Sequence, residues 1–199
     1  MSLFHGLLGS AGAFALLSGC SSDATETSQP QENQVAVSNG TASDEDLIRK
    51  AMSVAPDAIS REASVVVRNL DGSTRTLRPG TNGWTCMPDR PRTPGTDPMC
   101  MDQASMRWAQ ALRNKQAPPR DATGISYMSA GNDANNVDPH ARQPEPGDQR
   151  IESAGPRLMI VGIPVEQLKN YPSGRNPDTT KPYVMWAGTE YAHLMVPVR

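Results

Sequence analysis

Apolar and polar residues divide this chain into three regions. Residues 7–17 (LLGSAGAFALL) are almost continuously apolar, whereas residues 21–41 (SSDATETSQPQENQVAVSNGT) are mostly polar and contain no aromatic residue. The apolar run is shorter than the roughly 20 residues of a membrane-spanning helix, and the polar region cannot bury enough surface to offset its ordering entropy. From Ser43 onward, apolar positions recur with the spacing of helices and strands. We therefore expect a targeting segment, a flexible tether and one folded domain over residues 43–199.

Three segments of the domain are predicted to be helical. The first begins after Ser43, an N-cap candidate, and stops before Pro56. Its apolar positions have helical spacing: Leu47, Ile48, Ala51, Met52, Val54 and Ala55. The second covers Asp102 to Lys115, with Trp108 as its main core residue, and a third, shorter helix is expected over Pro164 to Asn170.

A hairpin is the clearest strand signal. Residues 64–70 (SVVVRNL) and 73–77 flank Asp71-Gly72, a pair typical of two-residue hairpin turns. Further strands are expected at Ile125–Met128, Leu158–Val161, Tyr183–Trp186 and Leu194–Val198. Pro197 lacks an N–H, so the last strand should lie at an edge or point that position outward. The pattern predicts an α+β domain with a mainly antiparallel sheet, two or three helices, long loops and one disulfide.

The end of the apolar run resembles the lipobox of bacterial lipoproteins. It reads Leu17-Ser18-Gly19-Cys20. The resemblance implies that residues 1–19 are a signal peptide, that Cys20 is lipidated, and that residues 20–42 tether the domain to a membrane of the bacterial cell envelope. The six residues before the apolar run contain no Lys or Arg, so either the true start lies further upstream or the signal is atypical. The alternative is a short buried helix at the beginning of a globular domain.

The other two cysteines, Cys86 and Cys100, form an even pair once Cys20 is assigned to lipid. In an oxidising envelope they should be bonded, and a bridge across a loop of about 15 residues contributes on the order of 3 kcal/mol. Four prolines make the enclosed loop stiff and unsuited to a helix or a central strand: Pro88, Pro91, Pro94 and Pro98. A thiol redox site is the alternative, but its usual Cys-x-x-Cys spacing is missing.

Several blocks of the domain resemble a group of small exported bacterial proteins. The blocks are residues 81–86 (TNGWTC), 97–102 (DPMCMD), 182–189 (PYVMWAGT) and 191–198 (YAHLMVPV). This resemblance implies export and a paired Cys86 and Cys100. It implies no reaction, ligand or catalytic residue.

Charge and motifs exclude some functions. The formal net charge of −2 provides no basic field for nucleic acid. Apart from His5, the histidines are His140 and His193, and the serine-elbow, zinc-helix and phosphate-loop motifs are missing. A hydrolase would need one of these two histidines as a base, although a hydrogen-bonded His193 on a half-buried strand is the simpler interpretation. Alternation along the last two strands puts Trp186 and Leu194 on one face and His193 on the other. We expect Trp186 and Leu194 to be core residues and His193 to be partly accessible beside the loop around His140.

Two metal sites are conceivable. His193 and Met195 share one face of a predicted strand and, with His140, are candidate ligands for copper or another soft metal. Methionines beside Cys86 and Cys100 add thioethers, but methionine is also an adaptable core filler. Residues 132–138 (NDANNVD) could bind calcium, yet they lack the EF-hand spacing and suit a solvated loop. We therefore expect a non-enzymatic binding or structural module without a cofactor, with soft-metal binding or hydrolysis as alternatives.

Overall fold

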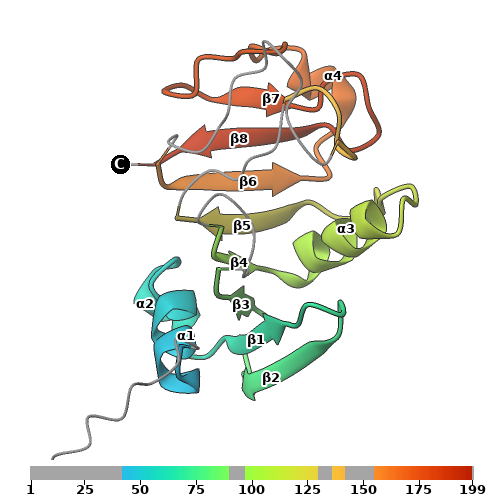
Figure 1. Cartoon of the computed structure of the whole chain (residues 1–199). Helices are drawn as coiled ribbons and strands as arrows, with labels where there is room; N and C mark the ends of the chain where they lie inside the picture. Colours follow the sequence, from blue (N-terminus) through green and yellow to red (C-terminus); the bar gives the residue numbers. More distant parts are fainter. Residues whose placement is uncertain (1–41, 90–96, 130–135, 142–154, 199) are drawn as a thin grey trace, which may run out of the picture. The chain divides into compact units, whose positions relative to one another are not determined.

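The computed structural model describes residues 42–89, 97–129, 136–141 and 155–198, all within one compact unit, residues 40–199. The predicted signal peptide, Cys20 and most of the predicted tether lie outside the described residues. The described part contains four helices and eight strands (Figure 1). The helices are α1 (Asp44–Met52), α2 (Asp57–Ser60), α3 (Gln103–Arg113) and α4 (Val165–Leu168). The strands are β1 (Ser64–Arg68), β2 (Thr74–Arg78), β3 (Thr85–Met87), β4 (Met99–Met101), β5 (Gly124–Met128), β6 (Arg157–Val161), β7 (Tyr183–Met185) and β8 (His193–Pro197).

All eight strands join in one sheet with the order β2-β1-β3-β4-β5-β6-β8-β7. Every neighbouring pair is antiparallel except β1 and β3, which run parallel. Figure 1 shows the strands stacked as a ladder, with α1 and α2 beside its β1 end and α3 beside β4 and β5. The predicted α+β fold with a mainly antiparallel sheet and one disulfide is confirmed.

Helix α1 begins where its N-cap was predicted. Ser43 Oγ accepts a hydrogen bond from Asp46 N at 3.1 Å, which satisfies one of the free amides of the first turn. At the other end, Ser53 N donates to Arg49 O, so α1 ends before Pro56. The N-cap of α3 is Asp102, whose carboxylate accepts from Ser105 N at 2.7 Å and from Ile125 N at 2.8 Å. Asp102 therefore caps α3 and also ties it to β5.

The β1–β2 hairpin has a three-residue loop rather than the predicted two-residue turn. Asn69 N donates to Ser73 O at 2.8 Å, and Gly72 N donates to Asn69 O at 3.1 Å. Gly72 has a φ of 87°, the left-handed conformation that closes a three-residue hairpin loop. The predicted hairpin exists, but Asn69 instead of Leu70 pairs with Ser73 to close its loop.

Two glycines let backbone segments approach closely. The connection from β2 to β3 crosses the beginning of β1 at Gly80, where an added Cβ would lie 2.1 Å from Ser64 N. This crossing turns the chain so that β3 runs parallel to β1. At Gly124, an added Cβ would lie 2.4 Å from Ser105 N, so α3 can lie directly on β5. Any side chain at either position would push these elements apart.

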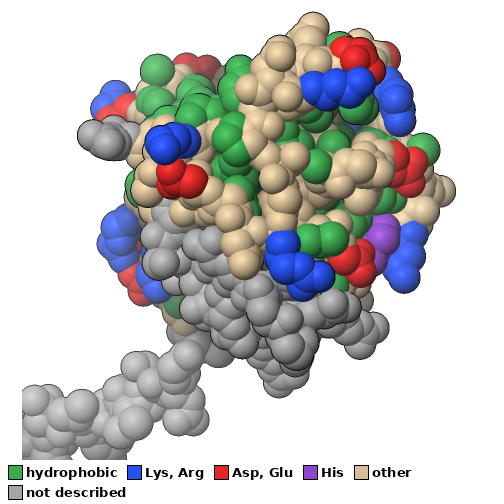
Figure 2. Space-filling model, turned by 90° about the horizontal axis from the view of Figure 1, so that it is seen from above, with side chains coloured by type: hydrophobic (Ala, Val, Ile, Leu, Met, Phe, Trp, Pro, Cys, Tyr) green, Lys and Arg blue, Asp and Glu red, His purple; other side chains and the backbone are tan. Residues whose placement is uncertain are grey.

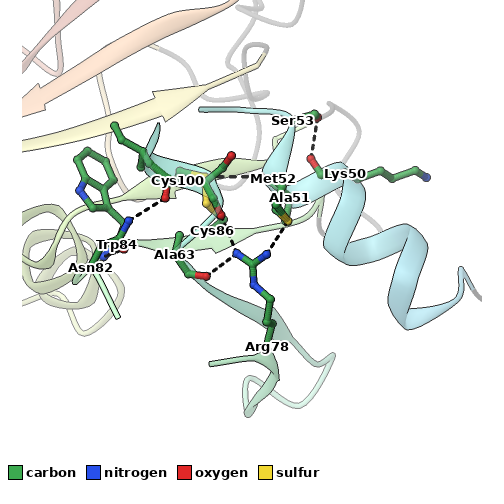
Figure 3. Close-up of a disulfide and its surroundings, with 12 residues drawn as sticks. Lys50, Ala51, Met52, Ser53, Ala63, Arg78, Asn82, Trp84, Cys86 and Cys100 are labelled. Carbon is green, nitrogen blue, oxygen red and sulfur yellow. Dashed lines mark hydrogen bonds between the residues drawn. A yellow bond between two sulfur atoms is a disulfide. The ribbon is translucent and has the colours of Figure 1, made fainter. Parts of the chain in front are cut away.

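The disulfide joins Cys86 on β3 to Cys100 on β4, which are directly paired across the two strands. Their Cα atoms are 3.9 Å apart, closer than the 4.4–6.8 Å that is usual for disulfides. Figure 3 shows the bridge under the end of α1, with Ala51 O 3.5 Å from Cys100 Sγ. A disulfide sulfur carries no proton, so this is a packing contact. The bridge was predicted, but the two short central strands that carry it were not.

Both edges of the sheet are covered or charged. On edge strand β2, the Arg75 guanidinium makes two hydrogen bonds to the Asp44 carboxylate, at 2.7 and 2.8 Å. Arg78 donates to Ser60 O, and Figure 3 shows its second hydrogen bond, to Ala63 O. The other edge strand, β7, has only three residues, and Val184 N donates to Pro172 O at 2.8 Å. Edge strands that carry charged side chains or are covered by another segment resist pairing with another chain.

The final strand, β8, is not an edge strand, because β7 pairs along its outer side. The β7 ladder stops at Met195, and Val198 N donates inward to Pro156 O at 2.9 Å. The ring nitrogen of Pro197 therefore points away from β6, past the end of β7. Of the two predicted alternatives, the outward orientation of Pro197 is confirmed, and the edge position does not occur.

Candidate functional site

One face of the sheet is built from methionine. Cross-strand pairing puts directly opposed residues on the same face, and Cys86, Cys100 and Tyr127 share the face that α1 covers. The opposite face, covered by α3, carries seven of the ten methionines: Met87, Met99, Met101, Met128, Met159, Met185 and Met195. We call this the methionine face.

Three of these methionines form a continuous row across three strands. Met87 on β3 is paired with Met99 on β4, and Met99 is paired with Met128 on β5. Met101 lies two residues beyond Met99 on the same face, so Met99 is the centre of the group. Met87, Met101 and Met128 are buried, whereas Met99 is half-buried and is the member most open to solvent.

A pocket of about 150 Å³ lies between this row and α3. Five methionines line it, together with Trp108 and Ala109 of α3 and Trp186: Met87, Met99, Met101, Met128 and Met159. Three charged residues also line it, namely the buried Asp97 and the arginines Arg68 and Arg113. The pocket is thus an apolar, sulfur-rich hollow with two guanidinium groups and one carboxylate in its wall.

On the methionine face, the row of side chains next to Met87, Met99 and Met128 contains a buried hydroxyl group. Ser126 is paired with Met101 on one side and Met159 on the other, and it is fully buried. Its Oγ has no hydrogen-bond partner among the described residues. A buried hydroxyl without a partner costs free energy, so Ser126 is an unfavourable polar position in a mostly apolar surface.

Aromatic rings form the wall of the pocket nearest the C-terminal strands. Trp108 of α3 is stacked parallel to Trp186 with ring centroids 6.1 Å apart, and Tyr191 meets Trp108 edge-on at 6.1 Å. Trp186 directly follows β7 and has a φ of 57°, so its side chain leaves the strand alternation. It packs on the methionine face, not beside Leu194 as strand alternation suggested. Both Trp186 and Leu194 are core residues, as predicted.

His193 lies behind this wall. Its ring is edge-on to Trp108 at 5.1 Å and to Trp186 at 5.0 Å, and only 1% of the residue is exposed. Nδ1 is 2.9 Å from Tyr191 O, and since a carbonyl only accepts, Nδ1 carries the proton. Burial lowers the pKa of His193 to about 4, so the ring is neutral at pH 7. The expectation that His193 is partly accessible is wrong, because α3 and Trp186 cover the face on which it lies.

None of the three predicted metal ligands lines the methionine pocket. Met195 follows His193 on the methionine face but is paired with Met159 and Tyr183, and it does not line the pocket. His140 is exposed, and its ring meets the ring of Tyr191 at 5.2 Å. Tyr191 therefore contacts both histidines, by its ring and by its carbonyl oxygen. The soft ligands that the fold does bring together are the methionines beside the cysteines.

A buried arginine ends the methionine row. Arg157 on β6 is paired with Met128, and it donates to Gly155 O at 3.0 Å and to Tyr183 Oη at 3.1 Å. Burial lowers the pKa of Arg157 and raises the pKa of Tyr183. The acceptors of these hydrogen bonds from the guanidinium are neutral oxygen atoms, and the contact with Tyr183 connects β6 to β7.

The suggested calcium loop is only partly described, because residues 130–135 lie outside the described residues. Within it, Asn136 is buried, and its Nδ2 donates to Val184 O at 3.2 Å and to Gly174 O. Trp186 N donates to Asn136 O at 3.1 Å. Asn136 therefore fastens this segment to the end of β7, which is a structural use of the side chain.

A second, larger hollow of about 300 Å³ lies on the other side of Trp108. Its wall includes two prolines that follow α3 and three charged residues: Arg120, Glu166 and Glu190. Figure 2 shows one face of the molecule, where acidic and basic side chains alternate around patches of apolar side chains instead of gathering by sign. The methionine pocket has the more distinctive chemistry, since five soft sulfur atoms share one small enclosure.

Comparisons with protein-family models, with curated proteins and with solved structures gave no significant match. The resemblance to small exported bacterial proteins thus stays a prediction. None of the described helices has the length and hydropathy needed to cross a bilayer.

Proposed function

We propose that this chain is a lipid-anchored, non-enzymatic binding module of the bacterial cell envelope, and that the methionine pocket is its ligand site. The observation that carries the proposal is the enclosure of one pocket by five methionines and two tryptophans. Methionine side chains are flexible and polarisable, and such surfaces adapt to a ligand. The lipobox at Cys20 and the paired cysteines support the envelope location.

Catalysis by His193 is a weaker interpretation. A general base must reach the proton that it removes and needs a pKa near the working pH. His193 is buried behind two indoles, with Nδ1 held by a backbone carbonyl and a pKa of about 4. These features suit a packing residue that fixes the end of β8. His140 is exposed, and its backbone N donates to Asp138 Oδ1 at 2.8 Å, a loop contact.

Filling the pocket tests the proposal. Ala109 of α3 lines the pocket, so Ala109→Phe places a ring in the space that a ligand would use. The full chain is extracted from bacterial envelopes with mild detergent and weighed by native mass spectrometry. We expect wild-type protein to carry a non-covalent mass that Ala109→Phe lacks and that Gln110→Phe, on the exposed side of α3, retains. The absence of any bound mass, or its persistence in Ala109→Phe, would contradict the proposal.

A further inference from the structure

The size of the methionine pocket limits what can bind there. Sites for drug-sized organic ligands measure about 300–1,000 Å³, whereas this pocket measures about 150 Å³. It is large enough for an ion or a very small molecule. Size alone therefore favours the smallest class of ligand, and the lining decides its chemistry.

Apart from the Asp97 carboxylate, the ligand atoms that the lining side chains offer are soft and neutral. The methionine sulfurs are thioethers, and the only cysteines of the described residues are bonded to each other on the opposite face of β3 and β4. No group of three or more His, Cys, Asp or Glu side chains suited to a metal occurs in the described part of the chain. Thioethers select Cu(I) and chemically similar ions, while carboxylate and carbonyl oxygens suit magnesium, calcium and manganese.

The row of three methionines has a spacing that one ion can bridge. Three sulfur atoms each about 2.3 Å from a metal lie about 4 Å from one another in a trigonal arrangement. Directly opposed residues of neighbouring strands have Cβ atoms about 4.5–5.5 Å apart. Met99 is directly opposed to both Met87 and Met128. Because methionine has three rotatable side-chain bonds, the two outer side chains can lean toward the central one.

The charge of the pocket wall further restricts which ions can bind. Asp97 provides one carboxylate, and Arg68 and Arg113 provide two guanidinium groups. Both the repulsion from the two arginines and the attraction to the one carboxylate double when the bound cation is divalent, and the arginines outnumber the carboxylate. The wall therefore disfavours divalent ions more than monovalent ions. Attraction has to come from bonds between sulfur and the metal, and this again points to a soft monovalent ion.

We propose that Met87, Met99 and Met128 form a site for one soft monovalent metal ion of the Cu(I) class. The proposal rests on the proposed function, since it names the ligand of the same pocket. It differs from the predicted set of His193, Met195 and His140, because none of these three residues lines the pocket. Half-buried Met99 is the entry position, and the buried Met87 and Met128 complete the coordination.

The test is a metal titration of the full chain under anaerobic conditions. Cu(I) is added in competition with a chromophoric Cu(I) chelator, and Ag(I) is added in a parallel titration as a soft ion without redox chemistry. We expect one ion per chain and a change in tryptophan fluorescence, because Trp108 and Trp186 line the same pocket. Met99→Leu and Met128→Leu should each weaken binding at least tenfold. Leucine conserves the apolar volume, so folding should persist and is checked by circular dichroism and thermal melting.

Met185→Leu is the matched control. Met185 is a buried methionine of the same face that does not line the pocket. The affinity of Met185→Leu for Cu(I) and Ag(I) should therefore stay within twofold of the wild-type affinity. Failure of both ions to bind would overturn the inference, as would unchanged affinity in both pocket variants or an equal loss in Met185→Leu. If neither ion binds but the envelope-bound mass still disappears in Ala109→Phe, only this inference fails. If no mass is bound either, the proposed function fails with it.

Discussion

Trp108 and Trp186 lie parallel, with their ring centroids 6.1 Å apart and an angle of 6° between their planes. One belongs to α3, and the other follows β7, so this contact joins the helix to the C-terminal strands. Both rings also contact His193. The stability of the domain and the shape of the methionine pocket therefore depend on the same pair of residues.

Removal of the Trp108 side chain should strongly destabilise the domain. Trp108 is 4% exposed and contacts Trp186, Tyr191 and His193. We expect Trp108→Ala to lower the free energy of unfolding by about 3–5 kcal/mol, the usual loss for a large buried aromatic residue. Urea denaturation followed by circular dichroism measures this. Trp108→Phe should lose clearly less, and equal losses would show that the ring contacts contribute little.

His193 should make stability depend on pH. Its pKa is lowered from 6.5 to about 4 in the folded protein, so the unfolded chain binds a proton first as the pH falls. Stability present above pH 6.5 is lost progressively down to pH 4, by up to about 3 kcal/mol. Urea denaturation at several pH values between 7 and 4 should show this loss in wild type and a smaller one in His193→Gln.

The acidic range provides an internal check on that experiment. Hydrogen bonds from Thr180 and Lys181 lower the pKa of Asp178 to about 2, so its contribution is lost only below pH 3.8. The histidine and this carboxylate therefore act in separate pH ranges. Identical pH profiles of wild type and His193→Gln above pH 4 would mean that the histidine proton is not linked to folding.

The disulfide should stabilise the centre of the sheet. Cys86 and Cys100 are separated by 14 positions, and a bridge over such a loop contributes about 3 kcal/mol in the chain-entropy model. We expect the double variant Cys86→Ala and Cys100→Ala to lose about this amount in chemical denaturation. Reductant should lower the stability of wild type but leave that of the double variant unchanged. A double variant as stable as wild type would contradict the prediction.

The lipid anchor is tested at Cys20. Serine cannot form a thioether, so Cys20→Ser should stay in the aqueous phase of a detergent partition while wild type enters the detergent phase. Mass spectrometry of the N-terminal peptide checks the attached lipid. The same phase and the same N-terminus in both proteins would mean that the lipobox interpretation is wrong.

Strong local signals in the sequence were reliable. Ser43 and Asp102 mark the starts of α1 and α3, and the predicted strands at β5, β6, β7 and β8 are all present. Strands β3 and β4 were missed because they have three residues each and flank a proline-rich loop, which leaves too few positions to show alternation. Their pairing comes from tertiary contacts, including the close approach of Gly80 to β1.

The methionine site could be identified only from the register of the sheet. The sequence shows Met99 and Met101 on either side of Cys100, a spacing that puts both on one face of a strand. Only the pairing of β3, β4 and β5 shows that Met87 and Met128 lie on the same face. The expected exposure of His193 was wrong for a similar reason, since no local pattern reveals which face α3 covers.

The two protected edges have a consequence for crowded conditions. Arg75 and Arg78 occupy edge strand β2, and the chain at Pro172 and Ser173 pairs with the short edge strand β7. Copies held by a lipid in one plane would meet far more often than freely diffusing ones. Because neither edge offers a long row of free backbone groups, such encounters should not propagate into a continuous sheet through many molecules. Many copies of the protein could therefore lie close together on one surface and still remain separate molecules.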